Sequence, residues 1–473
     1  MQSAKIEFDK IQDECGIYGV YSNRLSDEIK YDVYYGLYAL QHRGQESAGI
    51  AIVFSDEIHC YKNEGLVSNV LNEKILNKMV QTDLALGHVR YGTEEYSNIE
   101  NAQPMRFKGK AGAFAIAMNG KITNARILRA KERAEGALFH TNSDVEVIAH
   151  LINKFVVDGD IVKGIEKAVE YLEGSFSIGI MTTNSIIAIR DRFGLRPLVI
   201  GNKFDDYYIA SESCAFDATE VDLIRDVEPG EIIVIDHSGL RSIKMKNIER
   251  RPCIFEYIYT ARADSIIDGK SVYKARYECG LRLAKRLNIE ADLVAGVPDS
   301  AVVAARGYAA GANLPYIDVL EKNRYIGRTF IQPTQLMREN SVKIKLNVHR
   351  ANIEGKRVIL VDDSIVRGTT SKKIIELIKH FGAKEVHLVI ASPILKHPCY
   401  TGIDIESREQ LIGAKMSLKE VCDSIGADSL HYMSIKDLVD CCKGPNGSTF
   451  CTACFDGDYP DNIEQKILQQ RED

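Results

Sequence analysis

Cys15 opens the segment Cys-Gly-Ile-Tyr-Gly-Val, and a charged stretch of fourteen residues precedes it. If the Glu14–Cys15 bond is cut, Cys15 becomes the first residue and carries both a thiol and a free α-amine. The thiol can attack a carbonyl carbon, and the amine, with a reference pKa of about 8, can serve as the base. A single cysteine in an apolar segment is more often a small buried residue, so residues farther along the chain must decide between the two interpretations.

Four polar segments downstream suit an amide hydrolase. Asn119 with the N–H of Gly120 could stabilise an oxyanion. Arg90 could bind a carboxylate through its planar fork, and Asp144 could bind an ammonium group. Each alone has an ordinary explanation, because Asn-Gly is common in hairpin turns and Asp144 belongs to a helix-cap pattern. Together they fit an α-amino acid with a side-chain amide, glutamine or asparagine. The segments are 41–45, 87–93, 117–120 and 141–144, and the second and third are expected at strand ends.

A second motif lies in the C-terminal half. The apolar run 357–361 ends in Asp362-Asp363 and continues into a small, hydroxyl-rich loop that opens a helix. Amide groups at a helix N-terminus bind phosphate, and paired aspartates suit ribose hydroxyls or a hydrated Mg²⁺. An acidic turn with a Gly-Thr cap is the structural alternative. The unbroken order of strand, acid pair, loop and helix favours the phosphate site.

A basic segment separates the acid pair from the preceding strand–helix unit. It runs through 322–330 and 341–345 and fits no regular element well. Its structural interpretation is a solvated loop. Its functional interpretation is a lid whose cations, Lys322, Arg328 and Lys345, cover a polyanionic substrate and exclude water.

The composition is that of a globular enzyme with more than one domain. The chain has 473 residues, of which 45% are hydrophobic and 27% charged, and this length exceeds one typical core. The net charge of −6 gives no reason to expect nucleic-acid or membrane binding. The sequence has neither a secretory h-region nor an apolar run of eighteen residues. Its eleven cysteines, without an export signal, favour free thiols, metal ligation or catalysis in a reducing cytoplasm.

Short β-rich runs over 15–240 must position the first group of residues. Many are continuous apolar runs, and helical patterns at 143–156 and 161–172 lie between them. We therefore expect two stacked sheets between layers of helices.

The pattern changes after a boundary expected near 240–252. From there, apolar strands alternate with helices, including those expected at 300–311 and 370–381. This alternation predicts a parallel sheet covered on both faces.

The N-terminal set of residues resembles the N-terminal-nucleophile (class II) glutamine amidotransferases, whose domain begins with Cys-Gly-Ile-x-Gly. The resemblance covers residues 15 to about 240 and implies an αββα sandwich that releases ammonia and leaves glutamate. It implies Cys15 as the nucleophile, Asn119 and Gly120 as the oxyanion hole, and Arg43, Arg90 and Asp144 as glutamine-binding residues, with Arg43 supporting the active centre.

The C-terminal motif resembles the phosphoribosyl-pyrophosphate motif of the type I phosphoribosyltransferases. This resemblance implies a parallel-sheet domain in which the loop 296–301 cradles pyrophosphate. The implied Mg²⁺ ligands are Ser300, Asp362 and Asp363. The implied binding residues for phosphoribosyl pyrophosphate are Lys322, Arg328, Lys345, Asp362, Asp363, Ser364, Ile365, Val366, Arg367, Gly368, Thr369 and Thr370.

The two halves in this order resemble the amidophosphoribosyltransferase family along almost the whole chain. The segments KNRYIGRTF and VDDSIVRGTTS are the most specific for it. The family makes 5-phosphoribosylamine, glutamate and pyrophosphate from glutamine and phosphoribosyl pyrophosphate, the first committed step of de novo purine biosynthesis. The resemblance also implies an ammonia channel, inhibition by purine nucleotides, a homotetramer and a cytoplasmic location.

Four cysteines resemble positions where one branch of this family holds a structural [4Fe–4S] cluster. Cys253 and Cys399 each follow a proline, and Cys451 and Cys454 form a Cys-Thr-Ala-Cys segment. A Cys₄ zinc site is the alternative. Members of that branch carry a short propeptide, so we expect a propeptide over 1–14, an amidotransferase domain over 15–245, and a phosphoribosyltransferase domain with the cluster segments over 246–473.

Two other functions remain open at this point. A class II amidotransferase such as a hexosamine-phosphate synthase would need sugar-phosphate isomerase domains, and the acid-pair loop argues against them. A nonenzymatic regulator that senses phosphoribosyl pyrophosphate predicts a damaged nucleophile or oxyanion set, whereas Cys15, Asn119 and Gly120 are all present.

Overall fold

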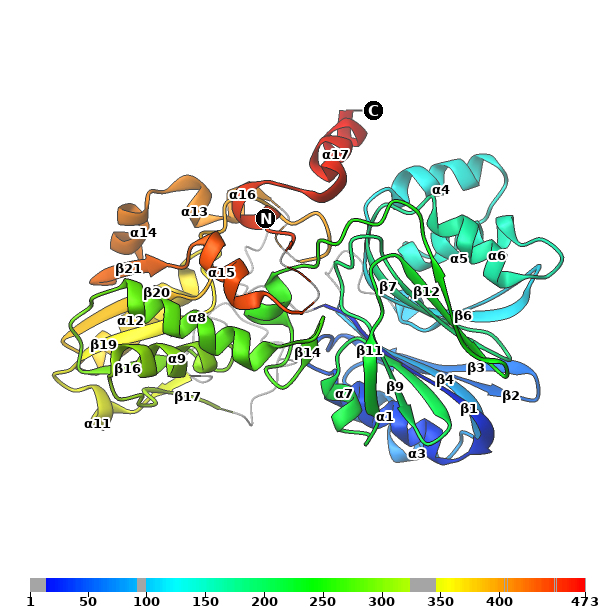
Figure 1. Cartoon of the computed structure of the whole chain (residues 1–473), viewed down its shortest axis with the longest axis horizontal. Coiled ribbons are helices and arrows are strands. Elements are labelled where there is room, and N and C mark those ends of the chain that lie inside the picture. Colours follow the sequence, from blue (N-terminus) through cyan, green and yellow to red (C-terminus); the bar gives the residue numbers. More distant parts are fainter. Residues whose placement is uncertain are drawn as a thin grey trace, which may run out of the picture.

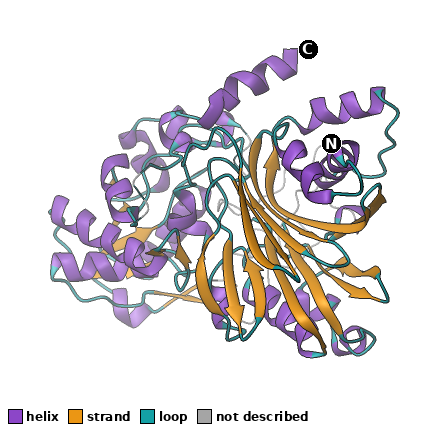
Figure 2. Ribbon diagram, turned by 45° about the vertical axis from the view of Figure 1, so that its right-hand side comes forward, coloured by secondary structure: helices purple, strands orange, loops and turns teal. Residues whose placement is uncertain are grey.

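The computed structural model describes residues 14–91, 99–323, 346–403, 405, 407–445, 447 and 449–472. The two halves of the chain lie side by side in it (Figure 1). The N-terminal half is dominated by curved strands, and the C-terminal half is richer in helices (Figure 2).

The first sheet of the N-terminal half has seven strands in the order β11-β9-β10-β1-β4-β2-β3, and every neighbouring pair is antiparallel. Its outer face packs against short helices through an apolar core. The central strand begins directly after Cys15, so the sheet holds that residue in place. The strands are β1 (Gly16–Ser26), β2 (Ser47–Phe54), β3 (Glu57–Glu64), β4 (Thr82–Arg90), β9 (Val199–Lys203), β10 (Asp206–Ala210) and β11 (Asp222–Asp226), and the helices are α1 (Glu28–Ala39), α2 (Val67–Val70), α3 (Glu73–Leu76) and α7 (Cys214–Asp217).

The second sheet has six antiparallel strands in the order β13-β12-β8-β7-β6-β5. Its inner face packs on the first sheet through residues such as Ile17, Leu86 and Ala117, and its outer face is covered by three helices. The αββα sandwich expected from the sequence is confirmed. The strands are β5 (Met105–Gly109), β6 (Gly112–Ile122), β7 (Gly174–Met181), β8 (Ile186–Arg190), β12 (Glu231–Asp236) and β13 (Gly239–Lys244), and the helices are α4 (Ala125–Ala134), α5 (Asp144–Phe155) and α6 (Ile161–Val169).

The C-terminal half contains a four-stranded parallel sheet in the order β16-β19-β20-β21. Helices α8, α9 and α15 cover one face and α12 and α14 the other, which confirms the expected parallel sheet. Its strands are β16 (Leu293–Gly296), β19 (Arg357–Asp362), β20 (Glu385–Ile390) and β21 (Ser429–Tyr432), and these helices are α8 (Val272–Arg286), α9 (Val302–Ala312), α12 (Thr369–His380), α14 (Leu418–Ile425) and α15 (Ile435–Cys442).

Smaller elements complete the C-terminal half. A single π-helical turn, η3 (Glu256–Thr260), comes soon after the N-terminal sandwich. The others are β14 (Ile266–Ile267), β15 (Lys270–Ser271), β17 (Leu320–Lys322), β18 (Leu346–Val348), α11 (Arg350–Ile353), α13 (Ile412–Lys415), α16 (Ala453–Asp456) and α17 (Ile463–Glu472). Within the described ranges, no helix has the length and apolar character needed to cross a membrane.

The predicted helices agree closely with the observed ones, and side-chain caps mark the starts of α5 and α6. The Ser143 hydroxyl accepts from the Val145 N–H at the start of α5, and Asp160 does the same for α6. Helices α9 and α12 begin within two residues of their predicted starts.

Buried ion pairs join the two halves. Arg190 of β8 binds Asp268 at 2.9 Å, and the Asp268 N–H donates to Asp226 of β11 at 2.8 Å. These contacts fix the sandwich against the segment that precedes α8.

Candidate active site

Cys15 lies at the start of the central strand and is partly buried. Its thiol donates toward the Tyr91 carbonyl oxygen at 3.8 Å, and burial raises the pKa of the thiol. Gly44 lies against the neighbouring backbone, where a Cβ would come within 2.5 Å of the Arg90 carbonyl carbon. A glycine is therefore needed for the loop that follows α1 to pass close to the end of β4 at Arg90.

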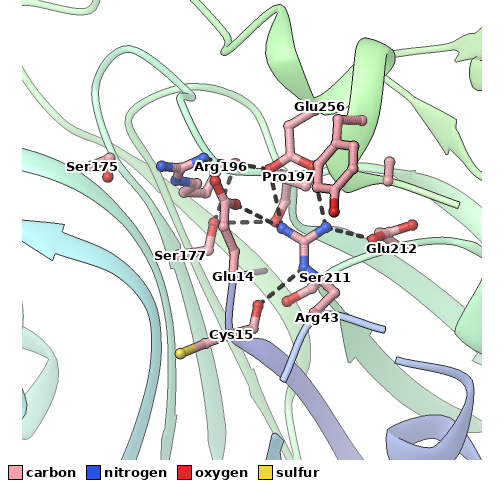
Figure 3. A network of polar contacts seen from close by, with 12 residues as sticks. Glu14, Cys15, Arg43, Ser175, Ser177, Arg196, Pro197, Ser211, Glu212 and Glu256 are labelled. Atoms are coloured by element: carbon pink, nitrogen blue, oxygen red, sulfur yellow. Dashed lines mark hydrogen bonds and ion pairs between the residues drawn. The ribbon is translucent and has the colours of Figure 1, made fainter. Parts of the chain in front are cut away.

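Arg43 fixes the backbone of Cys15. Its Nε donates to the Cys15 carbonyl oxygen at 3.0 Å, and its terminal nitrogens bind three carboxylates (Figure 3). These are Glu14 and Glu256, each at 3.0 Å, and Glu212. Although burial disfavours the charge, Glu256 and Glu212 raise the pKa of the Arg43 guanidinium. The donors of Arg43 are thus used within the chain, which suits a supporting role.

Glu14, the residue before the nucleophile, is buried in the same cluster. Its carboxyl group binds both Arg43 and Arg196 and hydrogen-bonds to Glu256. Burial raises the pKa of Glu14 to about 8, and the Glu256 carboxylate adds to this effect while Arg196 opposes it. A cut between residues 14 and 15 would remove one acid from this buried cluster.

Asn119 and Gly120 lie inside β6, and the expectation that they end a strand is corrected. The strand continues to Ile122 because these last residues pair with β7. Asn119 is buried, and neither its side-chain nitrogen nor its oxygen has a hydrogen-bond partner among the described residues. Gly120 has φ +134°, and a Cβ there would lie 2.1 Å from the Ser175 carbonyl oxygen. An unbonded buried amide beside a glycine N–H can form an oxyanion hole.

Arg90 and Asp144 lie near the oxyanion pair on different elements. Arg90 ends β4, is 9% exposed, and binds Glu46 at 2.9 Å. Asp144 begins α5 and accepts from the Ile122 N–H at 3.0 Å, two residues beyond Gly120, and burial raises its pKa. The structure therefore gathers the predicted nucleophile, oxyanion pair and both charged clamps in one part of the sandwich.

A second polar group lies at the carboxyl edge of the parallel sheet. Asp362 ends β19, and its carboxylate accepts a hydrogen bond from the Asp363 N–H at 2.9 Å. The hydroxyls of Ser300 and Ser364 both donate to Asp363, the latter at 2.8 Å. Both aspartates are buried. Gly368, with φ +81°, then turns the chain into α12, so the predicted Mg²⁺ ligands meet beside a helix N-terminus.

The rest of the predicted phosphate-binding set is only partly described. Lys322 ends β17 and is paired with Asp299, whereas Arg328 and Lys345 lie outside the described residues. Ile365 and Val366 point into the apolar cores, so only their backbone could face a phosphate. Arg367, Thr369 and Thr370 follow in the loop and the first turn of α12.

Segment η3 joins the two polar groups. Glu256 at its start binds Arg43. Burial raises the pKa of Tyr259 near the end of η3, and the charges of Asp363 and Asp362, followed by Tyr91, raise it further. Arg276 of α8 holds the segment, since its guanidinium donates to the carbonyl oxygens of Tyr257 at 2.8 Å and Ala261 at 2.7 Å. A small cavity reaches from Ser300 and Asp363 to Ile258 and Arg276.

The four predicted cluster cysteines lie near one another. Cys253 and Cys451 form a short parallel bridge, and the Cys454 carbonyl oxygen accepts from the two N–H groups just before Pro398-Cys399. Burial raises the pKa of Cys454, and the thiolates of Cys253, Cys399 and Cys451 raise it further. In the part of the chain that the structure describes, however, no group of three His, Cys, Asp or Glu side chains is arranged to hold a metal.

Arg196 lies between these cysteines and the Glu14 cluster. Burial alone would lower the pKa of Arg196, and Glu14, Cys253 and Glu256 raise it. Its Nη2 binds the Thr401 carbonyl oxygen, and its Nε has no partner within the described ranges. The group of four cysteines therefore has a buried cation beside it.

Comparison with known proteins identifies both halves. Residues 90–218 match a glutamine amidotransferase domain, and residues 277–402 match a phosphoribosyl transferase domain. An amidophosphoribosyltransferase from Archaeoglobus fulgidus is 47% identical over 454 residues, which cover 95% of this chain and 98% of the relative. The Bacillus subtilis enzyme is 43% identical, with 98% and 97% covered. The chain belongs to the amidophosphoribosyltransferase family.

Solved structures agree with this assignment. The B. subtilis glutamine phosphoribosylpyrophosphate amidotransferase, complexed with ADP and GMP, matches with a TM-score of 0.88 at 43% identity and covers 95% of this chain and 98% of that one. A structure described as the allosteric regulatory enzyme of purine biosynthesis matches with a TM-score of 0.90, also at 43% identity, over 96% and 97% of the two chains. As an amidophosphoribosyltransferase, the protein is an enzyme of the first step of purine biosynthesis. Glutamine and phosphoribosyl pyrophosphate fit its two domains as substrates.

Several residues that organise this amidophosphoribosyltransferase site were not found from the sequence. They are charged groups buried by contacts between distant segments, and only their apolar surroundings, as in CIFEYIYT around Glu256, gave a signal. These residues are Glu14, Arg196, Glu212, Glu256 and Arg276.

Proposed function

We propose that glutamine is hydrolysed at Cys15 and that the ammonia moves within the protein to phosphoribosyl pyrophosphate at the acid pair. The thiol attacks the glutamine amide carbon, ammonia leaves, and water releases glutamate from the thioester. Ammonia then bonds to C1 of the ribose as the bond from C1 to pyrophosphate breaks. The observation that carries this proposal is the turn η3, which contacts the first site and leads toward the second: Glu256 binds Arg43, which holds the Cys15 carbonyl oxygen, and the charges of Asp363 and Asp362 raise the pKa of Tyr259 in the same turn.

The roles in the first site follow from its contacts. Asn119 and Gly120 would donate to the oxyanion. Arg90 would exchange Glu46 for the substrate carboxylate, and Asp144 would bind the substrate ammonium group. Arg43, grouped with the glutamine-binding residues on sequence grounds, would act by holding Cys15.

In the second site, Ser300, Asp362 and Asp363 would hold Mg²⁺, which phosphoribosyltransferase domains commonly use. The ion would supply positive charge to the leaving pyrophosphate. The buried carboxylates with their serine partners fit a hard cation with oxygen ligands. The remaining proposed contacts to phosphoribosyl pyrophosphate are Lys322, Arg328, Lys345, Ser364, Ile365, Val366, Arg367, Gly368, Thr369 and Thr370.

The active form would begin at Cys15. In the uncut chain its nitrogen belongs to the Glu14–Cys15 peptide bond, so it cannot be the base. We propose residues 1–14 as a propeptide, 15–245 as the amidotransferase domain and 246–473 as the phosphoribosyltransferase domain. The end of β13 at Lys244 supports the second boundary.

A [4Fe–4S] cluster on Cys253, Cys399, Cys451 and Cys454 is also proposed, with a structural role. Four neighbouring thiols suit such a group, and the unbonded Nε of Arg196 offers positive charge to an anionic occupant. Metal and sulfide analysis separates it from zinc: we expect iron and sulfide that are lost in Cys451→Ser and kept in Cys422→Ser. Zinc without sulfide would contradict the proposal.

Regulation and assembly complete the proposal. ADP and GMP in the B. subtilis structure support inhibition by purine nucleotides. We further propose a homotetramer, by analogy with the family. We also propose a cytoplasmic location, since all eleven cysteines are free thiols.

The decisive experiment measures two reactions on one preparation. Cys15→Ala should abolish pyrophosphate release driven by glutamine and retain the release driven by an ammonium salt. Loss of both in a variant that still folds would contradict the division of chemistry between the domains. Full glutamine consumption by a chain whose intact mass still includes residues 1–14 would contradict the proposed propeptide.

A further inference from the structure

The oxyanion strand β6 is longer than its neighbour β5. Their pairing ends with Met105 opposite Ile116, so no β5 residue lies opposite Met118. Two side chains take over the bonds of the Met118 backbone instead. Gln103 accepts from its N–H at 2.7 Å, and His88 bonds its carbonyl oxygen at 3.0 Å.

His88 comes from the other sheet. It lies in β4, between Ile17 of β1 and Gly49 of β2, and its imidazole crosses to Met118 of β6. The contact is fully buried. One hydrogen bond therefore ties the strand that ends in Arg90 to the strand that carries the oxyanion pair.

The bond also fixes the state of the ring. A carbonyl oxygen only accepts, so His88 Nε2 carries a hydrogen, and in the neutral ring Nδ1 then carries a lone pair. Nδ1 has no partner among the described residues. Burial lowers the pKa of His88 to about 3, and the charges of Arg90 and Lys62 lower it as well. The ring therefore remains a neutral, fixed donor and does not carry protons during turnover.

The Asn119 side chain depends on this arrangement. Its amide makes no hydrogen bond within the described residues, so the backbone on which it stands sets its direction. The peptide that begins at the Met118 carbonyl is the one that enters Asn119. Displacement of a reacting group by about 1 Å can cost about a hundredfold in rate.

We propose that His88 is a positioning residue for the oxyanion hole: by holding the Met118 carbonyl, it directs the Asn119 amide toward the oxyanion formed from the glutamine amide. The inference rests on the proposed role of Asn119 and Gly120. The ammonium-driven reaction, which needs no oxyanion at this place, does not depend on His88.

Three substitutions of His88 separate the effect of the position of its hydrogen-bond donor from the effect of its side-chain volume. The H88Q variant places an amide donor near the position of Nε2, whereas H88N places one too short to reach, and H88L fills the space without a donor. We expect H88L and H88N to lower kcat for glutamine hydrolysis by about tenfold to a hundredfold, with KM for glutamine within about twofold. H88Q should recover kcat to within about threefold of the parent across the pH range. The ammonium-driven rate is the control for folding in each variant.

Two readouts exclude a merely structural role. A glutamine analogue with an aldehyde in place of the amide forms a tetrahedral adduct with a thiol, and its affinity should fall in parallel with kcat, while glutamate affinity stays constant. In a double-mutant cycle, H88L should have no further effect on kcat in the N119A background, because both act through one amide.

The outcomes are distinguishable. If N119A leaves glutamine hydrolysis unchanged, the proposed oxyanion hole fails. If N119A is impaired while H88N matches the parent, or if H88Q is no better than H88N, the positioning role of His88 fails and the oxyanion hole stands. If H88L does not fold, the comparison of H88N with H88Q still decides the question.

Discussion

Arg43 Nη2 lies 3.0 Å from Glu256 Oε1, although the two residues belong to different halves of the chain. The same guanidinium donates to the Cys15 carbonyl oxygen. The backbone of the nucleophile is therefore held by a charge that an acid of the other half helps to stabilise.

Arg43→Gln should destabilise the protein strongly. The substitution removes the cation that Glu212 and Glu256 share, leaving Glu212 with His42 at 2.8 Å and Glu256 with Arg196 at 3.6 Å. Breaking a buried ion pair costs about 3–5 kcal/mol. Arg241→Gln is the matched control, because Arg241 pairs with Asp236 at the surface and should cost less than about 1 kcal/mol. Denaturant unfolding measures both free energies, and similar values for the two variants would contradict the role of Arg43.

Glu14 should make the stability of the uncut chain depend on pH. Its folded pKa of about 8 exceeds the ordinary glutamate value near 4.3, so the folded chain holds a proton that the unfolded chain releases. This contribution is complete below the unfolded pKa and is lost as pH rises through the folded pKa. Between about pH 5 and 8, Glu14→Gln should therefore lose stability less steeply than the parent.

Unfolding free energies at pH 5, 6, 7 and 8, on chains whose intact mass shows that they are uncut, test this prediction. Glu57→Gln, at an exposed position, controls for the loss of a charge. Parallel curves for Glu14→Gln and the parent would exclude Glu14 as the titrating group.

Gly120→Ala should be far more damaging than Gly112→Ala on the same strand. Both glycines have positive φ, so both substitutions carry backbone strain of about 1–2 kcal/mol. At Gly112 a Cβ meets nothing within 4 Å, whereas at Gly120 it would strike the Ser175 carbonyl oxygen. We expect glutamine hydrolysis to fall about a hundredfold or more in Gly120→Ala and to stay near the parent rate in Gly112→Ala. Equal rates would remove Gly120 from the site.

Asp363→Asn should abolish the transferase reaction selectively. The variant keeps the shape of the side chain and removes the charge that two serine hydroxyls contact. We expect pyrophosphate release with either nitrogen source to fall about a hundredfold or more, and glutamine hydrolysis without phosphoribosyl pyrophosphate to persist. Asp423→Asn, at an exposed position of α14, is the control. An intact ammonium-driven rate would contradict the assignment of the acid pair.

The fold was predictable because its signals are local. Continuous apolar runs marked the strands, and the cap pattern at Ser143 marked the start of one helix. The strand–acid–loop–helix order near Asp362 also lies within one short segment. These patterns need no knowledge of distant contacts.

The contacts around the nucleophile were not predictable because they join distant segments. Glu212 and Glu256 are far from Arg43 in sequence, and each looks like an ordinary acid in its own segment. The Asn119-Gly120 pair was expected at a strand end, and pairing with β7 keeps it inside the strand. In both cases, contacts between segments far apart in the sequence decided the outcome.

The salt bridges that cross from the sandwich to the segment before α8 bear on attempts to express the halves as separate polypeptides. A break after residue 245 would leave Arg43 and Arg190 in one fragment, and Glu256 and Asp268 in the other. Each fragment would then have to hydrate ions that the whole molecule shields, so isolated halves should aggregate or unfold. Co-expressed fragments should recombine, because reassociation restores neutral pairs on both surfaces at once.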